Sequence, residues 1–347
     1  MSKHILFMVH GMGKYDKDWH KSIAARIATL YSSYSQLAGL PFSDYFEFES
    51  ITYDSEFEAL REQWKKSSNA LGTAIKAAGI SASLVGKLNQ IAGAANRNSF
   101  LNTHVVDVLL YYFLRQVAGM VRESVRNQIL TAIQKRGNVG SVRWSIIAHS
   151  LGTAVVHDAL HELYSDRTVG GGARFTGVAR PTVIAMIANV SRLLEGSGKF
   201  DVYRSKVHPG ADSDAGCLFY LSARHEWDPF TQPKKFAPMA DWPTPETRAR
   251  QLFVECQIRD VADTNVHALD HYLNNPAVHG PLFNALHGVP MRNGLLTSDD
   301  IETAHSLFVS GLKKELLDKA LKKLKSVRLG EEADWQSILK SWVTLLK

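Results

Sequence analysis

Residues 144–156, WSIIAHSLGTAVV, limit the folds open to this chain more than any other segment. An apolar run with aromatic and β-branched residues ends at Ser150, and a helix-like run follows without an intervening loop. Strands that feed directly into helices are typical of α/β proteins with a mostly parallel sheet. The segment therefore predicts a strand, a tight turn at the serine, and a helix that packs back on the sheet.

The same alternation recurs along the chain. Short apolar runs bounded by turn residues predict a sheet of about six strands. These runs are Ile5–Val9, Phe46–Tyr53, Arg143–Ala148, Thr182–Ala188, Cys217–Ser222 and Leu252–Ile258. Helical periodicity is clearest in His20–Tyr34, Val105–Gln134, Thr153–Tyr164 and Ser306–Leu324. The pattern predicts an α/β fold in which helices flank a mostly parallel sheet.

The chain between Tyr53 and Arg143 holds about ninety residues without a good strand, far more than one crossover connection needs. We therefore expect residues 57–135 to form a helical insertion, or cap, on a core made of residues 1–56 and 136–290. Residues 291–347 are expected to form amphipathic helices that pack on this core.

Two segments have features of membrane contact as well as of ordinary helix packing. Within residues 66–98, glycines recur every seven residues from Gly72 to Gly93. Residues 306–325 place leucines on one helical face and lysines on the other. Close helix packing and a solvated outer face are the ordinary interpretations, and peripheral contact with a membrane is the alternative.

Composition excludes several classes of protein. With 45% hydrophobic and 21% charged residues, the chain belongs with folded globular proteins and not with disordered ones. The formal net charge is +6, but the basic residues are spread out and no aromatic–basic motif accompanies them. Nucleic-acid binding is therefore not expected, and an anionic lipid surface fits the charge better.

The cysteines and the start of the chain bear on its compartment. Cys217 and Cys256 are the only two cysteines, and both lie in apolar runs, so no disulfide framework is expected. The apolar start of the chain is too short for the central region of a signal peptide. No run approaches the roughly 20 apolar residues of a membrane-spanning helix. We expect a cytoplasmic protein, with peripheral membrane contact as the alternative.

Ser150 is the candidate nucleophile. It is the centre of Ala148-His149-Ser150-Leu151-Gly152, between the expected strand and the expected helix. In a nucleophile elbow the serine occupies a strained turn, so the residues two positions before and after it must be small. Ala148 and Gly152 meet this requirement. His149 is expected to line a pocket or to pack, because its side chain should point away from that of Ser150.

A second motif, His10-Gly11-Met12-Gly13, follows the first predicted strand. A tetrahedral oxyanion needs two preorganised N–H donors, one from the residue after the nucleophile and one from a loop of this kind. Leu151 and Met12 are the candidate donors, and Gly11 is expected to let the backbone turn. The loop lacks a phosphate-binding or dinucleotide-binding fingerprint.

These two motifs, in this order, resemble the α/β-hydrolase superfamily. The resemblance is strongest to its lipase and esterase branch, including proteins related to glycosylphosphatidylinositol-inositol deacylases. It covers residues 1–56 and 140–290. It implies an α/β-hydrolase fold with a helical cap, in which the sheet begins at what is normally the third strand. It also implies a triad in the chain order serine, acid, histidine.

The resemblance implies an acid after a later strand and a histidine beyond the last strand. Asp228, which precedes a proline, is the candidate acid, and Glu226 is the alternative. His267 is the preferred base because it lies nearest the end of the last predicted strand, and His271 is the alternative. In this scheme the acid orients the imidazole, which takes the proton of the nucleophile.

Histidines spaced by four residues also resemble metal-ligand pairs. The two pairs are His267 with His271 and His157 with His161. Neither pair carries the glutamate of an H-E-x-x-H zinc site, and no third ligand is suggested by the spacing. No metal is therefore expected.

Together these residues predict a serine carboxylester hydrolase that acts on an acyl or lipid-like ester through an acyl-enzyme at Ser150. No cofactor is expected. Acyl transfer and thioester hydrolysis would use the same site and remain open. A non-catalytic lipid-binding or interaction protein on the same fold is the alternative from another class, because fold does not fix function.

Overall fold

The computed structural model describes residues 3–11, 15, 18–58, 111, 115–165, 179–195, 201–212, 215–238, 245–263, 265–312 and 318. Within these residues, six strands form one all-parallel sheet in the order β2-β1-β3-β4-β5-β6. The strands are β1 (His4–Val9), β2 (Phe46–Ile51), β3 (Trp144–His149), β4 (Val183–Ile187), β5 (Phe219–His225) and β6 (Phe253–Ile258). The predicted α/β class and the six predicted strands are confirmed.

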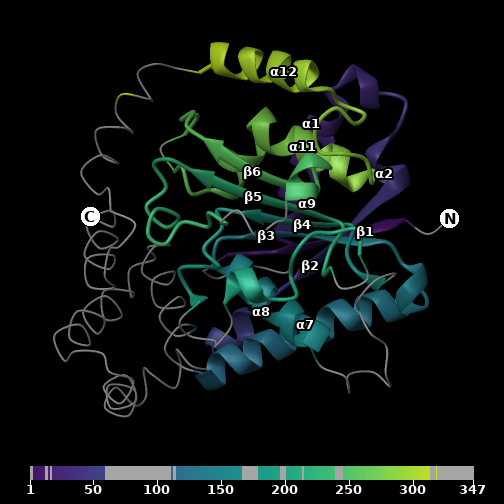
Figure 1. The fold of residues 1–347 in the computed structure, drawn as a ribbon, viewed down its shortest axis with the longest axis vertical. Helices are drawn as coiled ribbons and strands as arrows, with labels where there is room; N and C mark the ends of the chain where they lie inside the picture. The colour runs from purple at the N-terminus through teal and green to yellow at the C-terminus, as the bar shows by residue number, and fades with distance from the viewer. Residues whose placement is uncertain are drawn as a thin grey trace.

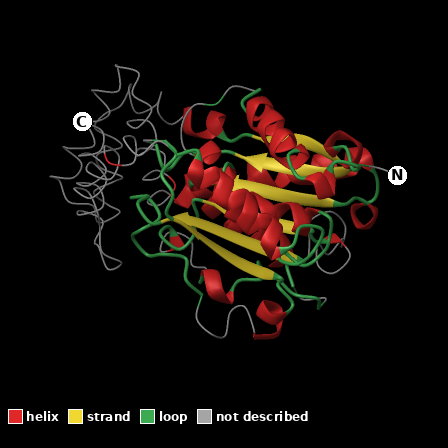
Figure 2. Ribbon diagram, turned by 90° about the horizontal axis from the view of Figure 1, so that it is seen from above, coloured by secondary structure: helices red, strands yellow, loops and turns green. Residues whose placement is uncertain are grey.

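Helices cover both faces of the sheet (Figures 1 and 2). On one face lie α7 (Arg115–Arg136) and α8 (Leu151–Ser165). On the other lie α1 (His20–Ser32), α10 (Leu269–Leu273), α11 (Pro276–Leu286) and, outermost, α12 (Ser298–Ser310). The short elements are α2 (Phe42–Tyr45), α9 (Pro245–Ala249), η1 (Ser35–Leu37), η2 (Val139–Ser141) and η5 (Val202–Arg204). The described residues therefore form three layers.

Each face of the sheet has its own hydrophobic core. On β1, Ile5, Phe7 and Val9 pack in the core shared with α7 and α8, while Leu6 and Met8 pack in the core shared with α1 and α11. Successive side chains of a strand point to opposite faces, so a strand covered on both sides must be apolar along its length. This is why the strands stand out in the sequence as uninterrupted apolar runs.

The order of the strands reverses at β1. The chain passes from β1 to β2 on one side, and β3 then pairs with the other side of β1. Such a reversal leaves a crevice at the carboxyl ends of the two strands, which is where ligands bind in open α/β sheets. His10 and Gly11 follow β1, and Ser150 follows β3. Both sequence motifs therefore meet at this crevice.

The position of helix α7 changes the bounds of the predicted helical insertion at residues 57–135. Val121, Val125 and Ile129 belong to the same core as β1 and β3, and α7 packs against α8. Residues 115–135 thus form a layer of the α/β core instead of part of a cap. Apolar periodicity predicted a helix here, but it could not indicate which surface that helix covers. Residues 59–110, which include the 66–98 segment, lie outside the described residues.

Of the helix predicted across 306–324, the structure describes only residues 306–312 and 318, and within these residues the bounds of the helix differ from the prediction. Helix α12 ends at Ser310, just before Gly311. It begins eight residues earlier than predicted, where Thr297 and Asp300 form a capping box in which each side chain accepts the other residue's backbone N–H. The Thr-x-x-Asp pattern was a start signal readable in the sequence.

Helix α12 is held on the core by Ile301. A Cβ atom added to Gly280 of α11 would lie 2.7 Å from Ile301 Cγ1, so α11 and α12 pack closely at this glycine.

None of the described helices is both long enough and apolar enough to span a bilayer. Beyond Leu312, the C-terminal part of the 306–325 segment lies outside the described residues except for Asp318.

Candidate active site

Ser150 lies in the turn between β3 and α8, at the carboxyl edge of the sheet. Its φ angle is 53°, in the left-handed region that residues other than glycine seldom adopt. The turn is held by the Ser150 N–H, which donates to Ile187 O, and by Thr153, whose N–H and Oγ1–H both donate to Ser150 O. This strained passage from strand to helix is the local context that the elbow motif requires.

Ser150, His267 and Asp228 are joined by a continuous series of hydrogen bonds. Ser150 Oγ–H donates to His267 Nε2 over 2.8 Å, and His267 Nδ1–H donates to Asp228 Oδ2 over 2.8 Å. The three residues follow β3, β6 and β5, whose carboxyl ends share one edge of the sheet. Because the carboxylate must accept the Nδ1 proton, Nε2 carries the lone pair that can take a proton from the serine.

The Asp228 side chain is 0% exposed and has a donor at each oxygen. Oδ1 accepts the Phe230 N–H over 2.9 Å, and Oδ2 accepts the Tyr272 O–H over 2.8 Å in addition to His267. Burial by itself raises the pKa of this carboxyl. His267 and the donated hydrogen bonds outweigh burial, so the pKa of Asp228 lies below its ordinary value. Asp228 is therefore ionised at neutral pH and can stabilise an imidazolium.

The alternative acid and the alternative base contact other groups. Glu226 pairs with Arg259, whose Nε lies 3.0 Å from Glu226 Oε2. His271 packs edge to face on His225, with ring centroids 5.1 Å apart. The structure thus brings Asp228 and His267 together with Ser150, and it places the Glu226 carboxylate and the His271 ring in other contacts.

His149 has a more specific position than the sequence indicated. Its ring lies beside that of His267, with centroids 5.1 Å apart, and its Nε2–H donates to the backbone carbonyl of His267 over 2.7 Å. Burial, followed by the nearby His267, lowers the pKa of His149 to about 3, so the ring is neutral and serves as a fixed donor. His149 therefore connects the turn at Ser150 to the loop that carries His267. No sequence pattern indicates this bond, because it joins the end of β3 to a loop far along the chain.

Of the residues proposed for the oxyanion site, the structure describes Leu151 and Gly11. Leu151 is the first residue of α8. The first amides of a helix have no partner within the helix, so the Leu151 N–H can donate to an oxyanion at the positive end of the helix dipole. Gly11 lies directly against Ser150, because an added Cβ would be 2.8 Å from Ser150 Cβ. Glycine is required there for close approach to Ser150, and not for the turn expected from the sequence. Met12 lies outside the described residues.

The carbonyl groups of the loop after β1 are fixed by aromatic side chains. His10 Nδ1–H donates to Gly11 O over 2.8 Å, and the Tyr53 hydroxyl lies 2.7 Å from His10 O and 3.0 Å from Gly11 O. The His10 ring lies between Tyr15 and Tyr53, with ring centroids 4.4 Å from each. This loop is therefore held in one position beside Ser150.

Gly152 is where the elbow helix meets β1. A Cβ atom there would overlap His10 O and would lie 3.0 Å from Val9 O. The requirement for a small residue at this position was predicted. The atoms that impose it belong to the neighbouring strand and its loop, which the sequence motif alone does not identify.

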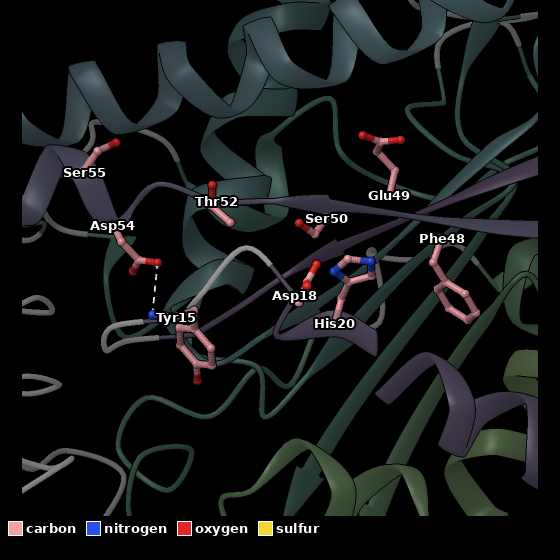
Figure 3. Close-up of a pocket in the computed structure, with 9 residues that line it drawn as sticks. All are labelled: Tyr15, Asp18, His20, Phe48, Glu49, Ser50, Thr52, Asp54 and Ser55. Atoms are coloured by element: carbon pink, nitrogen blue, oxygen red, sulfur yellow. Dashed lines mark hydrogen bonds between the residues drawn. The ribbon is translucent and has the colours of Figure 1, made fainter. Parts of the chain in front are cut away.

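Two cavities meet at Tyr15. One, of about 240 Å³, opens beside His267 and His149 and is walled on its other side by Tyr15, Trp19 and Ile23. The second, of about 500 Å³, lies beyond Tyr15 and is more polar (Figure 3). One wall includes Asp18, which precedes α1, and His20, the first residue of α1. Another wall comes from β2 and the residues after it, and includes Glu49, Ser50, Thr52 and Asp54.

The second histidine pair lies on α8, away from Ser150. His157 contacts Asp158 and Ser205, with Nε2 2.8 Å from Ser205 Oγ, and His161 Nδ1 accepts the Lys206 N–H over 3.3 Å. Across the described ranges, no three His, Cys, Asp or Glu side chains are arranged to hold a metal ion.

Comparison with known proteins adds little to this geometry. No family model matches the chain, and no curated protein matches it. A solved structure, described as an uncharacterized protein from Pseudomonas aeruginosa, matches with a TM-score of 0.33 and 10% sequence identity. The match covers 98% of this chain and 52% of the other, so this chain spans about half the length of that structure. The six-stranded parallel sheet flanked by helices defines an α/β protein.

Proposed function

We propose that the chain is a serine hydrolase of carboxylic esters, with Ser150 as nucleophile, His267 as general base and Asp228 as the orienting acid. The observation that carries the proposal is the Asp228–His267–Ser150 series, with both hydrogen bonds at 2.8 Å. A buried carboxylate, an imidazole and a hydroxyl in this order are the parts of a serine-hydrolase triad. The positive φ of Ser150 supports it, because that strain presents the hydroxyl at the crevice.

The geometry supports a two-step reaction. Ser150 Oγ attacks the ester carbonyl while His267 Nε2 takes the hydroxyl proton, and the Leu151 N–H stabilises the negative charge on the carbonyl oxygen. The intermediate collapses, the bond to the alcohol breaks, and His267 returns the proton to the departing oxygen. A water molecule then gives a proton to His267 and attacks the acyl carbonyl. The bond between the acyl group and Ser150 Oγ breaks, the acid leaves, and His267 returns the proton to Oγ.

We also propose that this is the α/β-hydrolase fold of the esterase and lipase branch, with a helical cap and with Met12 as second oxyanion donor. The strand–turn–helix context of the elbow and the nearness of Gly11 to Ser150 support the assignment. The cavity beside His267 measures about 240 Å³, below the roughly 300–1,000 Å³ of sites for drug-sized ligands. This size favours a short acyl or alcohol group at that position, and a series of nitrophenyl esters of increasing chain length would measure the preference.

A fluorophosphonate probe tests the proposal directly. The folded protein should form a covalent adduct at Ser150, and Ser150→Ala should abolish labelling. Ser22→Ala is the matched control, because Ser22 borders the same cavity beside His267 and should not change labelling. Mass spectrometry of the labelled peptide locates the adduct. A folded protein that takes no label would overturn the proposal and would leave the non-catalytic binding protein as the better explanation.

Gly11→Ala should lower kcat/KM for a simple ester by about 100- to 1,000-fold, the range for loss of one oxyanion donor. The new methyl group would lie 2.8 Å from Ser150 Cβ, so it must push the loop away from the nucleophile. Gly119→Ala on α7 is the control, because its added Cβ meets nothing within 4 Å. Equal rates for the two variants in a nitrophenyl acetate assay would show that the loop has no part in the reaction.

A further inference from the structure

Tyr272 joins the acid, the histidine loop and β5. It lies in α10, five residues after His267, and its side chain is fully buried. Its hydroxyl donates to Asp228 Oδ2 over 2.8 Å and accepts the His225 N–H over 2.9 Å. The direction of both bonds is fixed, because an N–H can only donate and the hydroxyl proton must then go to the carboxylate.

We propose that Tyr272 is a positioning residue of the active site, which acts through Asp228 to set both the orientation and the basicity of the triad. The inference rests on the proposed function, because it assigns Tyr272 a role in the reaction of Ser150 and His267. Tyr272 touches neither Ser150 nor the cavity beside His267 in the contacts of the described residues.

The orientation follows from the number of donors. Asp228 Oδ1 accepts one hydrogen bond, from Phe230, and Oδ2 accepts two, from His267 and Tyr272. With both oxygens held, the carboxylate cannot rotate away from His267 Nδ1. Hydrogen bonds to an ionised acceptor are about twice as strong as neutral ones, so the hydroxyl contributes appreciably to this hold.

The basicity follows from shared charge. Tyr272 and His267 donate hydrogen bonds to the same carboxylate oxygen, Asp228 Oδ2. Each bond therefore weakens the interaction of this oxygen with the other donor. A hydrogen bond to the charged form of an acid weakens its basicity. With Tyr272 in place, Asp228 therefore stabilises the imidazolium less than it would alone. Burial, followed by the charge of Asp228, raises the pKa of Tyr272 well above its ordinary value, so the hydroxyl stays a donor at every working pH.

The other ionisable groups around the Asp228–His267 pair would not obscure this effect. They are His149 of β3, His225 of β5, His271 of α10 and, behind His149, His10. Burial lowers the pKa of all four, to about 3 for His149 and about 4 for His10 and His271. The carbonyl of Asp260 accepts from His225, and Glu226 pairs with Arg259. The neighbouring imidazoles therefore stay neutral through the range in which an esterase is assayed.

Tyr272→Phe removes the hydroxyl and keeps the ring. We expect the acidic limb of the kcat/KM profile to move to higher pH by about 0.5 to 1 unit, because a more basic Asp228 stabilises the imidazolium better. The plateau value of kcat should fall about three- to tenfold, since the carboxylate is less firmly oriented. Tyr164→Phe is the matched control: it removes a buried hydroxyl that donates to Gly216 O over 2.7 Å, far from the triad in the fold, and should not move the limb.

A second variant and a second measurement guard against misfolding. Replacing Tyr272 by 3-fluorotyrosine keeps the hydroxyl and makes it a stronger donor, so the acidic limb should move to lower pH. Proton NMR of the downfield His267 Nδ1–H signal reports on the bond to Asp228 without any turnover, and the two changes at Tyr272 should shift it in opposite directions.

The outcomes separate this inference from the proposed function. If fluorophosphonate labels Ser150 but neither change at Tyr272 moves the limb or the Nδ1–H signal, Tyr272 is only a packing residue and the inference is wrong. If the folded protein takes no label, the proposed function fails, and an unmoved Nδ1–H signal would then also reject the link between Tyr272 and Asp228. Shifts of opposite sign in the two variants support the inference.

Discussion

His267→Ala should lower kcat/KM for nitrophenyl acetate by about 10³- to 10⁶-fold, while His271→Ala should stay within about threefold of the parent protein. His267 Nε2 is the acceptor of the Ser150 proton, and removing it leaves no base within hydrogen-bonding reach of Oγ among the described residues. The His271 ring packs on His225 instead. Initial rates of nitrophenolate release at neutral pH provide the measurement.

The two variants control for each other. Both remove a buried histidine from the same short stretch of chain, so both should lower the melting temperature by a few degrees, and a loss of activity confined to one cannot come from destabilisation. Far-ultraviolet circular dichroism checks that each is folded. Survival of activity in His267→Ala, or its loss in His271→Ala alone, would reverse the assignment of the base.

The strands could be predicted from the sequence because of where they lie. Both faces of the sheet are covered, so each strand must be apolar throughout and its sequence differs sharply from the loops around it. Helix bounds are harder to predict where the helix is only half buried. The apolar pattern predicts the start of α12 eight residues late, because the helix contacts the core mainly through Ile301 and its apolar face is weakly marked.

The residues of the candidate site could be predicted to different degrees. Ser150 was found because the elbow is a local motif, with its turn and its small neighbours on one short segment. The choice between His267 and His271 depends on where α10 begins. The helix starts at Leu269, which leaves His267 in the loop that reaches Ser150 and puts His271 within the helix. A shift of a few residues in that start would change the choice.

Tyr272 and the His149 bond to His267 were not predicted. Each depends on segments far apart in the chain meeting at one edge of the sheet, and no spacing along the chain encodes that meeting. A tyrosine in a helix and a histidine beside Ser150 have ordinary packing roles as their default interpretation. Their partners become visible only when the sheet order brings the carboxyl ends of β3, β5 and β6 together.

Asp228→Asn should lower kcat about 10⁴-fold, because an amide at this position can donate to Nδ1 and so favours the tautomer that puts the proton on Nε2, where the serine proton must go. The change is nearly isosteric in a fully buried site, and the Phe230 N–H can still be accepted by the amide oxygen. Single-turnover kinetics with nitrophenyl acetate should place the loss in the acylation step.

Glu226→Gln is the control, since it removes the alternative acid two residues away. Glu226 pairs with the exposed Arg259, and exposed ion pairs contribute about 0–1 kcal/mol, so this variant should keep its activity and most of its stability. The pH dependence of the two should also differ. Asp228→Asn should regain part of its rate at high pH, where hydroxide can take the place of the missing base, whereas Glu226→Gln should follow the parent profile. If Glu226→Gln loses activity and Asp228→Asn keeps it, the hydrogen bond between Asp228 and His267 is not the one that orients the base.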